Sequence, residues 1–466
     1  MTMPTAASID PAVLAKGLRA TFDSGRTRPL AWRQAQVRGL RRMMDECEDE
    51  LLAALRADLG RPAVEAFAAD IGHTKQELRH IDRHMAGWMR STKVGVPLTA
   101  APASAWVVPE PLGVVMVIAP WNYPIQLLVE PVAAALAAGN CVLAKPSEVA
   151  PTCSALLARV LPMYLDAEAI AVVEGGVEET TALLAERWDH IFFTGSTKVG
   201  HVVAEAAAKH LTPTVLELGG KSPTYVHASA DLDVAARRIA WGKFFNAGQT
   251  CIAPDYVLVD HQVKDALVDK LVSQIGTSFG IDPKSSASFG RIVSARHLDR
   301  LHGLLESGAG TVAVGGHVDH DERYIAPTVT VDPSPDGPLM SEEIFGPILP
   351  VLGVDGPSAA KAFIAARPKP LALYVFAERN DVVDDFVATT SSGGVCVNQT
   401  LMHLLPPDLP FGGVGDSGSG AYHGKSGFDA FSHRKSVLRK PTKPDLRLLY
   451  PPYNRVVERI VRRVAR

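Results

Sequence analysis

Three side chains in this chain of 466 residues could together carry out covalent catalysis. The apolar residues of the segment 231–245 recur at helical spacing. Gly248 follows this segment, and Cys251 comes shortly after Gly248. A thiol at such an element boundary can be reached by a ligand, and its thiolate form is a nucleophile. Many cysteines are instead small buried hydrophobes. The groups that surround Cys251 therefore decide between these two interpretations.

Glu217 and Asn122 each follow a predicted strand. The stretch 213–216 leads to Glu217, and the apolar run 114–118 leads to Asn122, which stands between two prolines. Open α/β sheets place ligand-binding residues at such strand ends. A carboxylate there could act as a general base, and a rigid amide could hold an oxyanion. Taken singly, the two residues also fit a solvated strand end and an ordinary turn.

The elements that must position these residues alternate between strand and helix. From Val114 to Leu218 the pattern predicts a parallel sheet with helices on both faces, which is a nucleotide-binding architecture. A second alternating region, from Asp231 to about Val397, would carry Cys251. The predicted strands of the first region are 114–118, 141–144, 170–173, 191–193 and 214–216, and its helices are 127–138, 152–165, 178–186 and 198–210. Amphipathic helices are expected before it, at about 11–20, 32–58 and 64–91.

The glycines that could bind a phosphate lie in an unusual place. The first strand-to-helix turn has no G-x-G-x-x-G pattern, whereas Gly195, Ser196, Thr197 and Gly200 open the helix after the fourth strand. Backbone N–H groups at a helix N-terminus favour a pyrophosphate. A helix cap formed by Ser196 or Thr197 without any ligand would give the same pattern.

Seven ordered motifs make the chain resemble the aldehyde dehydrogenase superfamily. They are PWNYP (120–124), KPSE (145–148), FTGSTKVG (193–200), LELGGKSP (216–223), FNAGQTCIAPDY (245–256), EEIFGP (342–347) and PFGGVGDSGSG (410–420). Two further stretches, GAYHGKSGFDAFSHRKS (420–436) and LLYPPY (448–453), are similar to the class 3 branch.

The resemblance implies a two-domain α/β fold in which each domain is a doubly wound, mostly parallel sheet, with a small oligomerisation arm. It implies an NAD(P)-binding domain, a catalytic domain with Cys251, and an arm that reaches a partner subunit, so that a homodimer is expected. The NAD(P)-binding domain would comprise 1–97 and 110–218, with about 410–434 returning to it. The catalytic domain would comprise 219–409, and the arm 98–109 and 435–453.

The resemblance also assigns roles for the oxidation of an aldehyde to its acid. Cys251 would form a thiohemiacetal and then a thioester, Asn122 would hold the oxyanion, and Glu217 would activate the hydrolytic water. The implied cofactor is NAD, with NADP possible, because Glu148 disfavours a 2′-phosphate while Lys145 favours one. The implied cofactor-binding residues are Lys145, Glu148, Gly195, Ser196, Thr197, Gly200, Leu218, Glu343 and Phe345.

The expected substrate channel is apolar and aromatic. Trp121, Tyr123, Trp241, Thr250 and His403 would line it, which suggests medium-chain aliphatic or aromatic aldehydes, although such residues could also be core packing. Two departures from the family pattern, Asp416 and the stretch 398–400 (Asn-Gln-Thr), are expected to affect substrate preference.

Composition restricts the partners. Lys and Arg number 47 against 50 Asp and Glu, so nothing indicates a nucleic-acid partner. The five cysteines form no C-x-x-C pair, which argues against zinc and disulfides and favours a reducing, cytoplasmic location. No apolar run approaches the ~20 residues of a membrane-spanning helix. The tail 454–466 reads as a basic amphipathic helix that could touch an anionic membrane surface, or pack on the enzyme or its dimer partner.

Three other functions fit parts of this pattern. A coenzyme A-acylating semialdehyde dehydrogenase would use the same cysteine, but such enzymes tend to lack the glutamate found here at 217. A non-catalytic binding protein would be expected to have lost Cys251, Glu217 or Asn122. A cysteine hydrolase of another fold needs a histidine base, and the sequence near Cys251 supplies none.

Overall fold

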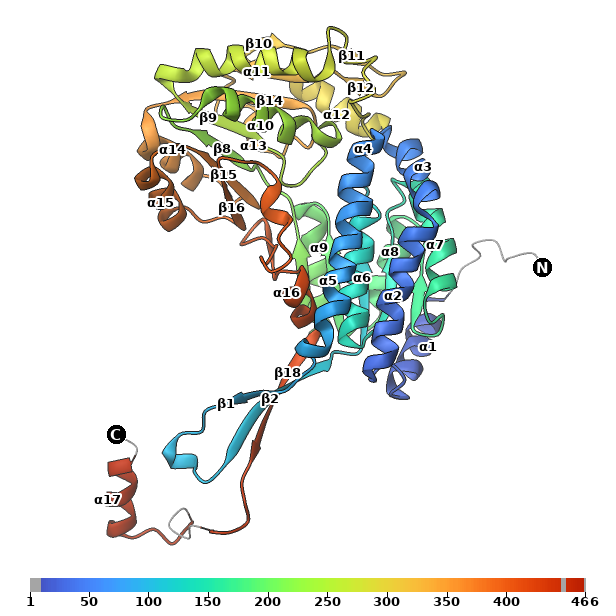
Figure 1. The fold of residues 1–466 in the computed structure, drawn as a ribbon, viewed down its shortest axis with the longest axis vertical. Helices are drawn as coiled ribbons and strands as arrows, with labels where there is room; N and C mark the ends of the chain where they lie inside the picture. The colour runs from blue at the N-terminus through green and yellow to red at the C-terminus, as the bar shows by residue number, and fades with distance from the viewer. Residues whose placement is uncertain (1–9, 446–449, 465–466) are drawn as a thin grey trace, which may run out of the picture.

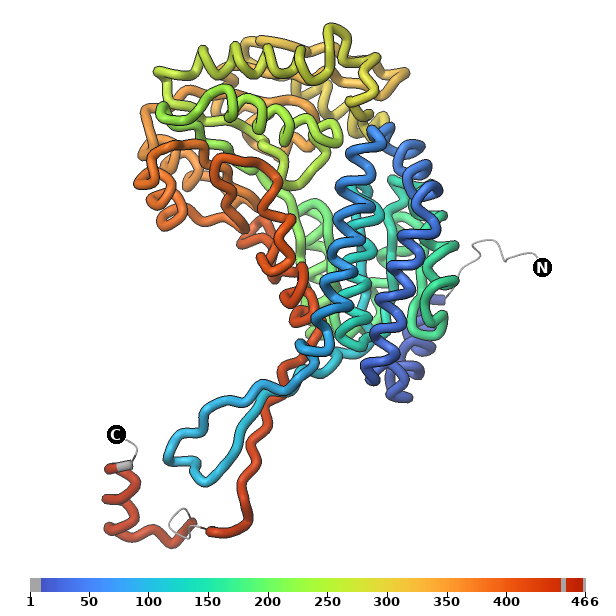
Figure 2. Tube along the Cα trace, in the orientation of Figure 1, coloured from blue at the N-terminus to red at the C-terminus, as the bar shows by residue number. Residues whose placement is uncertain are grey.

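The chain folds into two α/β domains and an arm that projects away from both of them (Figure 1). The structure is a computed structural model that describes residues 10–445 and 450–464. We call the domains the six-stranded domain and the seven-stranded domain after their main sheets. Figure 2 shows that the chain leaves the first domain for the arm and comes back, then passes to the second domain, returns past the first and enters the arm again.

The six-stranded domain is built on a sheet of order β17-β7-β6-β3-β4-β5. All strands are parallel except β17, which pairs antiparallel with β7. Every residue of β3, β4 and β6 is buried, as expected for a parallel sheet covered on both faces. The strands are β3 (Val114–Ile118), β4 (Cys141–Lys145), β5 (Ile170–Val172), β6 (His190–Thr194), β7 (Thr214–Glu217) and β17 (Gly418–Ser419).

The helices of this domain cover the two faces of its sheet. They are α1 (Pro11–Asp23), α2 (Leu30–Glu46), α3 (Glu48–Leu59), α4 (Ala63–Ala66), the π-helical turn η1 (Phe67–Gly72), α5 (His73–Trp88), α6 (Gln126–Ala138), α7 (Pro151–Tyr164), α8 (Val177–Ala185), α9 (Thr197–Ala208) and α16 (Gly424–Ala430). The strands and helices predicted between 114 and 218 are confirmed to within two residues at each end.

Two N-terminal helices differ from the prediction. The single helix expected at 32–58 is interrupted at Cys47, where α2 ends and α3 begins. The helix expected at 64–91 contains the π-helical turn η1. Apolar residues keep their helical spacing through both irregularities, so periodicity alone does not reveal them.

The seven-stranded domain has the sheet order β10-β13-β14-β9-β8-β15-β16, parallel except at its edge strand β10. Its strands are β8 (Pro223–Val226), β9 (Tyr256–Asp260), β10 (Thr311–Val314), β13 (Thr328–Val331), β14 (Ile348–Val354), β15 (Ala372–Phe376) and β16 (Gly394–Val397), with the separate pair β11 (Val318–Asp319) and β12 (Tyr324–Ile325). Its helices are α10 (Leu232–Phe244), η3 (Phe245–Gly248), η4 (His261–Val263), α11 (Lys264–Phe279), α12 (Ala295–Glu306), α13 (Pro338–Ser341), α14 (Gly356–Ala365), α15 (Asn380–Thr389) and η5 (Met402–Leu404).

The arm is a three-stranded antiparallel sheet of order β1-β2-β18. It consists of β1 (Thr92–Val94), η2 (Leu98–Ala100), β2 (Ser104–Pro111) and β18 (Ser432–Arg439), and α17 (Arg455–Val464) lies near its far end (Figure 1). Parts of the predicted arm and tail, 446–449 and 465–466, lie outside the described residues. Within those that are described, no helix has the length and apolar character needed to cross a membrane.

Candidate active site

Cys251 is presented by a tight reversal of the chain after α10. Asn246 and Ala247 have left-handed backbone angles, with φ of 53° and 52°, and Gly248 follows with φ of 75°. A side chain at Gly248 would meet the Gly346 carbonyl oxygen at 2.3 Å, so only glycine fits there. The reversal leaves Cys251 half-buried, and its side chain borders two cavities.

The first cavity has a volume of about 630 Å³ and joins residues from both domains. Asn122, Glu217 and Cys251 all line it, so the fold brings the three candidate catalytic residues together. The candidate cofactor residues Gly195, Ser196, Thr197, Leu218, Glu343 and Phe345 also line this cavity, as does Trp121.

Three candidate cofactor residues lie outside the lining of the first cavity. Gly200 packs against Leu218, whose Cδ2 would lie 2.6 Å from a side chain at Gly200. Lys145 is buried and donates to the Pro146 carbonyl at 2.9 Å and to Glu148 at 3.1 Å. Glu148 lines a neighbouring pocket of about 530 Å³ that adjoins the first cavity at His297.

The second cavity has a smaller volume, about 390 Å³, and we call it the tunnel. Most of its lining is apolar, and Tyr123, Trp241 and Thr250 belong to it together with Cys251. The Tyr123 hydroxyl lies 2.5 Å from the Thr250 hydroxyl, which fixes both side chains in the wall. The structure thus places three of the five candidate channel residues in this tunnel, whereas Trp121 lies in the first cavity.

His403 lies behind the tunnel wall, where its ring stacks on Phe411 at a centroid distance of 6.1 Å. The stretch 398–400 lies outside the lining as well. Asn398 bonds to the backbone of Ala377 in both directions, at 2.9 and 3.0 Å, and the Thr400 hydroxyl donates to the Arg238 carbonyl at 2.7 Å. These residues anchor the loop whose next members, Leu401 and Met402, do line the tunnel.

Asp416, the other departure from the family pattern, also lies outside the tunnel lining. It lines the first cavity, and its carbonyl accepts a hydrogen bond from the Thr197 hydroxyl at 3.2 Å. Asp416 therefore lies beside the N-terminus of α9 and outside the tunnel lining. At this position its charge would affect cofactor binding more than substrate preference.

Burial dominates the electrostatics around Cys251. Neither carboxylate oxygen of Glu217 has a hydrogen-bond partner among the described residues, and burial raises the pKa of this group well above its ordinary value. Burial also raises the pKa of the Cys251 thiol to about 12, with the Glu343 and Glu217 carboxylates adding to the increase. Burial raises the pKa of Glu343 to about 8, and Asp255 adds to it. With no ligand bound, the thiol is therefore protonated at neutral pH.

Asn122 is positioned by a buried polar network around Arg61. The guanidinium donates to the Asn122 carbonyl, to Asp70, and to the Asn246 side chain at 2.9 Å. The Asn122 side-chain amide donates to the Gln249 carbonyl at 3.1 Å. The two ends of this network are the loop with Asn122 and the loop with Cys251, so Arg61 fixes one catalytic loop against the other.

The first cavity fits a dinucleotide. Ser196 caps α9, so the free N–H groups of that helix open toward the cavity. Basic side chains line it as well: Lys198, Lys221, Arg300, Arg367 and Lys369. Glu343 lies against Gly219, where any added side chain would come within 2.0 Å of the Glu343 carboxylate. A helix N-terminus, positive charge and a fixed carboxylate are the groups that bind a pyrophosphate and ribose hydroxyls.

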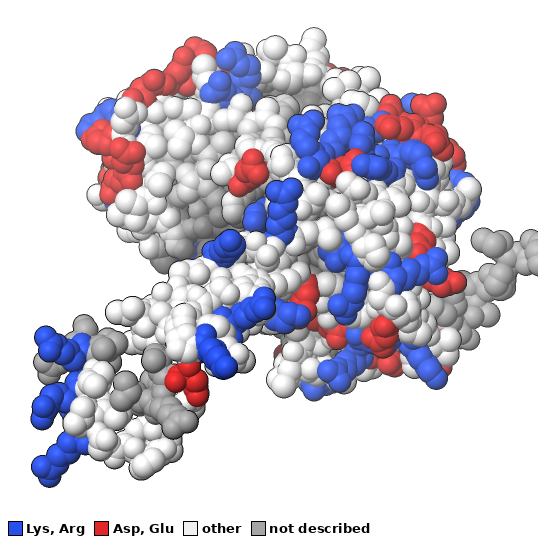
Figure 3. Space-filling view, turned by 60° about the horizontal axis from the view of Figure 1, so that its bottom comes forward, with Lys and Arg blue, Asp and Glu red and all other residues white. Residues whose placement is uncertain are grey.

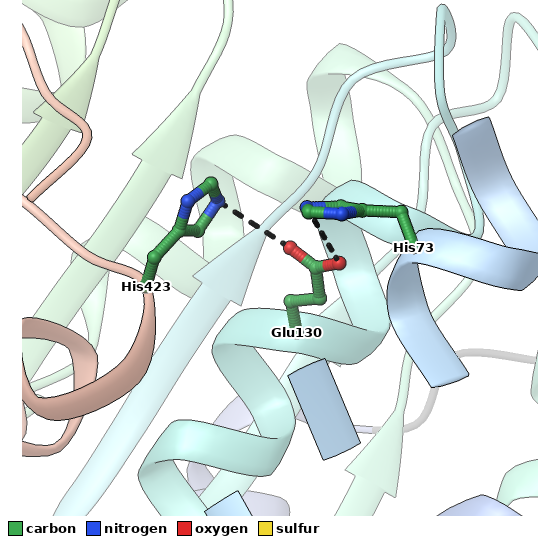
Figure 4. A group of neighbouring side chains, drawn as sticks. All are labelled: His73, Glu130 and His423. Carbon is green, nitrogen blue, oxygen red and sulfur yellow. Dashed lines mark ion pairs between the residues drawn. The ribbon is translucent and has the colours of Figure 1, made fainter. Parts of the chain in front are cut away.

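Sequence reasoning missed the residues that act across the fold. Arg61 and Asp70 lie in the N-terminal helical region, and no local pattern links them to PWNYP. The sequence also gave no signal for a buried group of His73, Glu130 and His423 beside the tunnel (Figure 4).

Comparisons with known proteins agree with this architecture. A model of the aldehyde dehydrogenase family matches residues 2–437. The chain is 48% identical to a dimeric NADP-preferring aldehyde dehydrogenase of Rattus norvegicus, over 91% of this chain and 93% of that one. It is also 48% identical to aldehyde dehydrogenase family 3 member B1 of Homo sapiens, over 93% of each chain.

A solved structure supports the same conclusion. It is the substrate-bound state of AldH from Staphylococcus aureus, which is 42% identical in sequence and superposes with a TM-score of 0.94. The match covers 96% of this chain and 98% of that one. By its sequence and its two-domain fold, the chain belongs to the aldehyde dehydrogenase family.

Proposed function

We propose that this NAD(P)-dependent aldehyde dehydrogenase acts through a thioester on Cys251, with Asn122 as oxyanion donor and Glu217 as general base. The observation that carries the proposal is that Cys251 borders both cavities. A substrate in the tunnel and a cofactor in the first cavity would therefore meet at one sulfur atom.

In the first step the Cys251 thiol gives up its proton to solvent, the resulting thiolate sulfur bonds to the aldehyde carbon, and the carbonyl oxygen takes up negative charge. The Asn122 amide has two N–H groups, of which Gln249 accepts one at 3.1 Å, so the other can donate to this oxygen. The backbone N–H groups of Cys251 and Ile252 favour the thiolate and supply further donors at the same place.

When it is bound, the cofactor supplies a hydride acceptor for collapse of the thiohemiacetal to a thioester. Glu217 then acts on a water: it takes one proton while the water oxygen bonds to the acyl carbon. The carbon–sulfur bond breaks, the acid leaves, and Cys251 regains its thiolate. The lack of hydrogen-bond partners around Glu217 in the described chain suits this role, because its oxygens remain free to accept the proton.

The six-stranded domain is the proposed dinucleotide-binding domain. We assign the pyrophosphate to Gly195, Ser196 and Thr197 at the start of α9, and the nicotinamide ribose to Glu343. Leu218 and Phe345 would border the aromatic rings of the cofactor. The seven-stranded domain, which carries Cys251, is the proposed catalytic domain.

Lys145 bears on the choice between NAD and NADP. Its three N–H groups are taken by the carbonyls of Pro146 and Gly175 and by Glu148, so none is left for a 2′-phosphate. We therefore expect NAD to be preferred. Glu148→Gln would remove a negative charge and release Lys145, so the kcat/KM ratio of NADP to NAD should rise about tenfold, or ~1.4 kcal/mol. Glu178→Gln, an exposed neutralisation on α8, should leave the ratio unchanged.

The apolar tunnel supports medium-chain aliphatic or aromatic aldehydes as substrates. The test of the proposed function is formation of the reduced cofactor with octanal, benzaldehyde and succinic semialdehyde, each with NAD and with NADP. Cys251→Ala should abolish it, whereas Cys396→Ala, at another half-buried thiol, should retain it. Activity that survives Cys251→Ala would contradict the proposal.

The arm supports a homodimer. Several large apolar side chains on or next to it are exposed in the single chain, among them Leu98 at 83% and Leu438 at 60%. We propose that a second copy covers them. Leu98→Asp with Leu438→Asp should shift the mass in solution from two chains to one, and an unchanged mass would exclude this contact.

We also propose that α17 contacts anionic membrane surfaces weakly. Val456, Ile460 and Val461 are exposed. Arg455, Arg459, Arg462 and Arg463 line a shallow depression on this helix, and Figure 3 shows basic side chains gathered at the end of the arm. A chain that stops after Asn454 should lose cosedimentation with phosphatidylserine vesicles. Equal binding by the full and shortened chains would contradict the proposal.

A further inference from the structure

Three ligand-type side chains from three separate elements meet in the wall of the substrate tunnel. His73 begins α5, Glu130 lies within α6, and His423 immediately precedes α16 (Figure 4). All three are buried, and one ligand atom from each lies within 4.8 Å of the others. His73 and His423 both line the tunnel that Cys251 borders.

We propose that His73, Glu130 and His423 bind a divalent first-row transition cation of the zinc type. Glu130 faces both rings: one carboxylate oxygen lies 3.7 Å from His73 Nε2, and the other lies 3.5 Å from His423 Nε2. Two donor atoms that are each ~2.1 Å from a tetrahedral ion lie about 3.4 Å apart. The two oxygen-to-nitrogen separations, one to each Glu130 oxygen, are close to this value, and the three ligand atoms lie within 4.8 Å of one another.

The donor types select the class of ion. Two imidazoles and one carboxylate suit zinc, cobalt or nickel, whereas magnesium and calcium prefer oxygen ligands throughout. Three protein ligands leave a fourth position open. The two histidines line the tunnel, so a water or a polar substrate group in the tunnel could fill that position.

The charges around the site also favour a cation. No Lys or Arg forms an ion pair with Glu130, or with the neighbouring buried Glu77, anywhere in the described chain. Both ring nitrogens of His73 and of His423 lack hydrogen-bond partners within the same residues. Burial of polar groups without partners is costly, and a bound cation would satisfy the rings and the carboxylate together.

Outer contacts hold the ligands in place. The Thr74 hydroxyl and the Gln126 amide donate to the two Glu130 oxygens at 3.4 and 3.5 Å. Glu77 accepts from the Gly424 N–H at 2.7 Å and so fixes the loop that carries His423. The π-helical turn η1 ends at Gly72, directly before His73, and such turns occur frequently at functional sites.

The test is made in a Cys251→Ala background, so that the tunnel thiol cannot itself bind the ion. The apoprotein is incubated with Zn²⁺ or Co²⁺, separated from free metal by gel filtration and assayed for bound metal. We expect one ion per chain. His73→Gln and Glu130→Gln should each weaken binding by more than the ~10–100-fold that is typical of outer-shell changes.

A buried histidine elsewhere provides the matched control. His190 is buried, also lacks hydrogen-bond partners in the described chain, and packs on Phe431 away from the tunnel. His190→Gln should bind one ion like the parent. The Co²⁺ form should show the visible absorption of a nitrogen- and oxygen-bound ion, without a thiolate band. Equal binding by His73→Gln and Glu130→Gln, a thiolate band, or no bound metal would each overturn the proposal.

Discussion

Removal of Arg61 should weaken the fold and the catalysis together, because one guanidinium joins the two catalytic loops. Its side chain and that of Asp70 are fully buried, and Arg61 donates to Asp70, Asn122 and Asn246. Loss of one partner of a buried ion pair typically costs ~3–5 kcal/mol of unfolding free energy. Arg61→Met keeps much of the apolar volume, so most of the loss should come from the polar contacts.

The structure places the cost near the lower end of that range, at about 3 kcal/mol. Asp70 keeps two other donors, the backbone N–H groups of Ile125 and Gln126, at 3.1 and 3.0 Å. Burial already raises the pKa of Asp70, with Arg61 opposing the increase. In the variant the carboxyl group can therefore take up a proton and avoid a bare buried charge. Loss of Arg61 should raise the folded-state pKa of Asp70 further, so the deficit relative to wild type grows as pH rises above the wild-type folded-state pKa of Asp70.

The activity should fall even where the variant is folded. Arg61 holds the Asn122 carbonyl, and a displacement of ~1 Å at a catalytic group can cost about 10²-fold in rate. We would measure urea unfolding and kcat/KM for Arg61→Met, Asp70→Asn and the double variant. Arg38→Met, which breaks the exposed pair with Asp82, serves as the control and should cost at most ~1 kcal/mol. The reasoning is refuted if Arg61→Met loses no more unfolding free energy than this control. It is also refuted if the losses from Arg61→Met and Asp70→Asn simply add in the double variant.

Other predictions follow from the site. Asn122→Ala should lower kcat by ~10²–10³-fold with little change in cofactor affinity, and stopped-flow kinetics would separate the two; an unchanged kcat would remove Asn122 from the oxyanion site. Because burial raises the pKa of Glu343 to about 8, its carboxylate fraction rises about tenfold between pH 7 and 9. Cofactor binding followed by tryptophan fluorescence should strengthen by about that factor, whereas Glu343→Gln should show a flat profile. Thr250→Val removes the partner of the Tyr123 hydroxyl at 2.5 Å and should raise the KM for the aldehyde without affecting the KM for the cofactor.

The sequence predicts the core of the six-stranded domain well because its strands are buried on both faces. A run such as Val114–Ile118 is uniformly apolar, and Gly113 before it and Pro120 shortly after it limit it, so its ends are visible. The sequence also predicts the chain reversal at Gly248, because a glycine close to a candidate nucleophile indicates a turn. What these signals share is that they are local in the chain.

The remaining features depend on residues that only the tertiary fold brings together. Arg61 is an isolated arginine in the sequence, and only the packing of the N-terminal helices brings it to the Asn122 carbonyl. His73, Glu130 and His423 lie far apart in the chain, so a search for closely spaced metal ligands passes over them. His403 was expected to line the tunnel. Its neighbour Met402 lines the tunnel instead, while the His403 ring packs on Phe411.

The most direct test of the account is mass spectrometry of Glu217→Gln after it has been mixed with octanal and NAD. Loss of the general base should slow deacylation by ~10²–10⁴-fold, whereas the preceding steps continue. We predict a burst of about one reduced cofactor per chain and an acyl group on the peptide that contains Cys251. Sustained turnover at the wild-type rate, or an acyl group on a different cysteine, would contradict the assignment of Glu217 and Cys251.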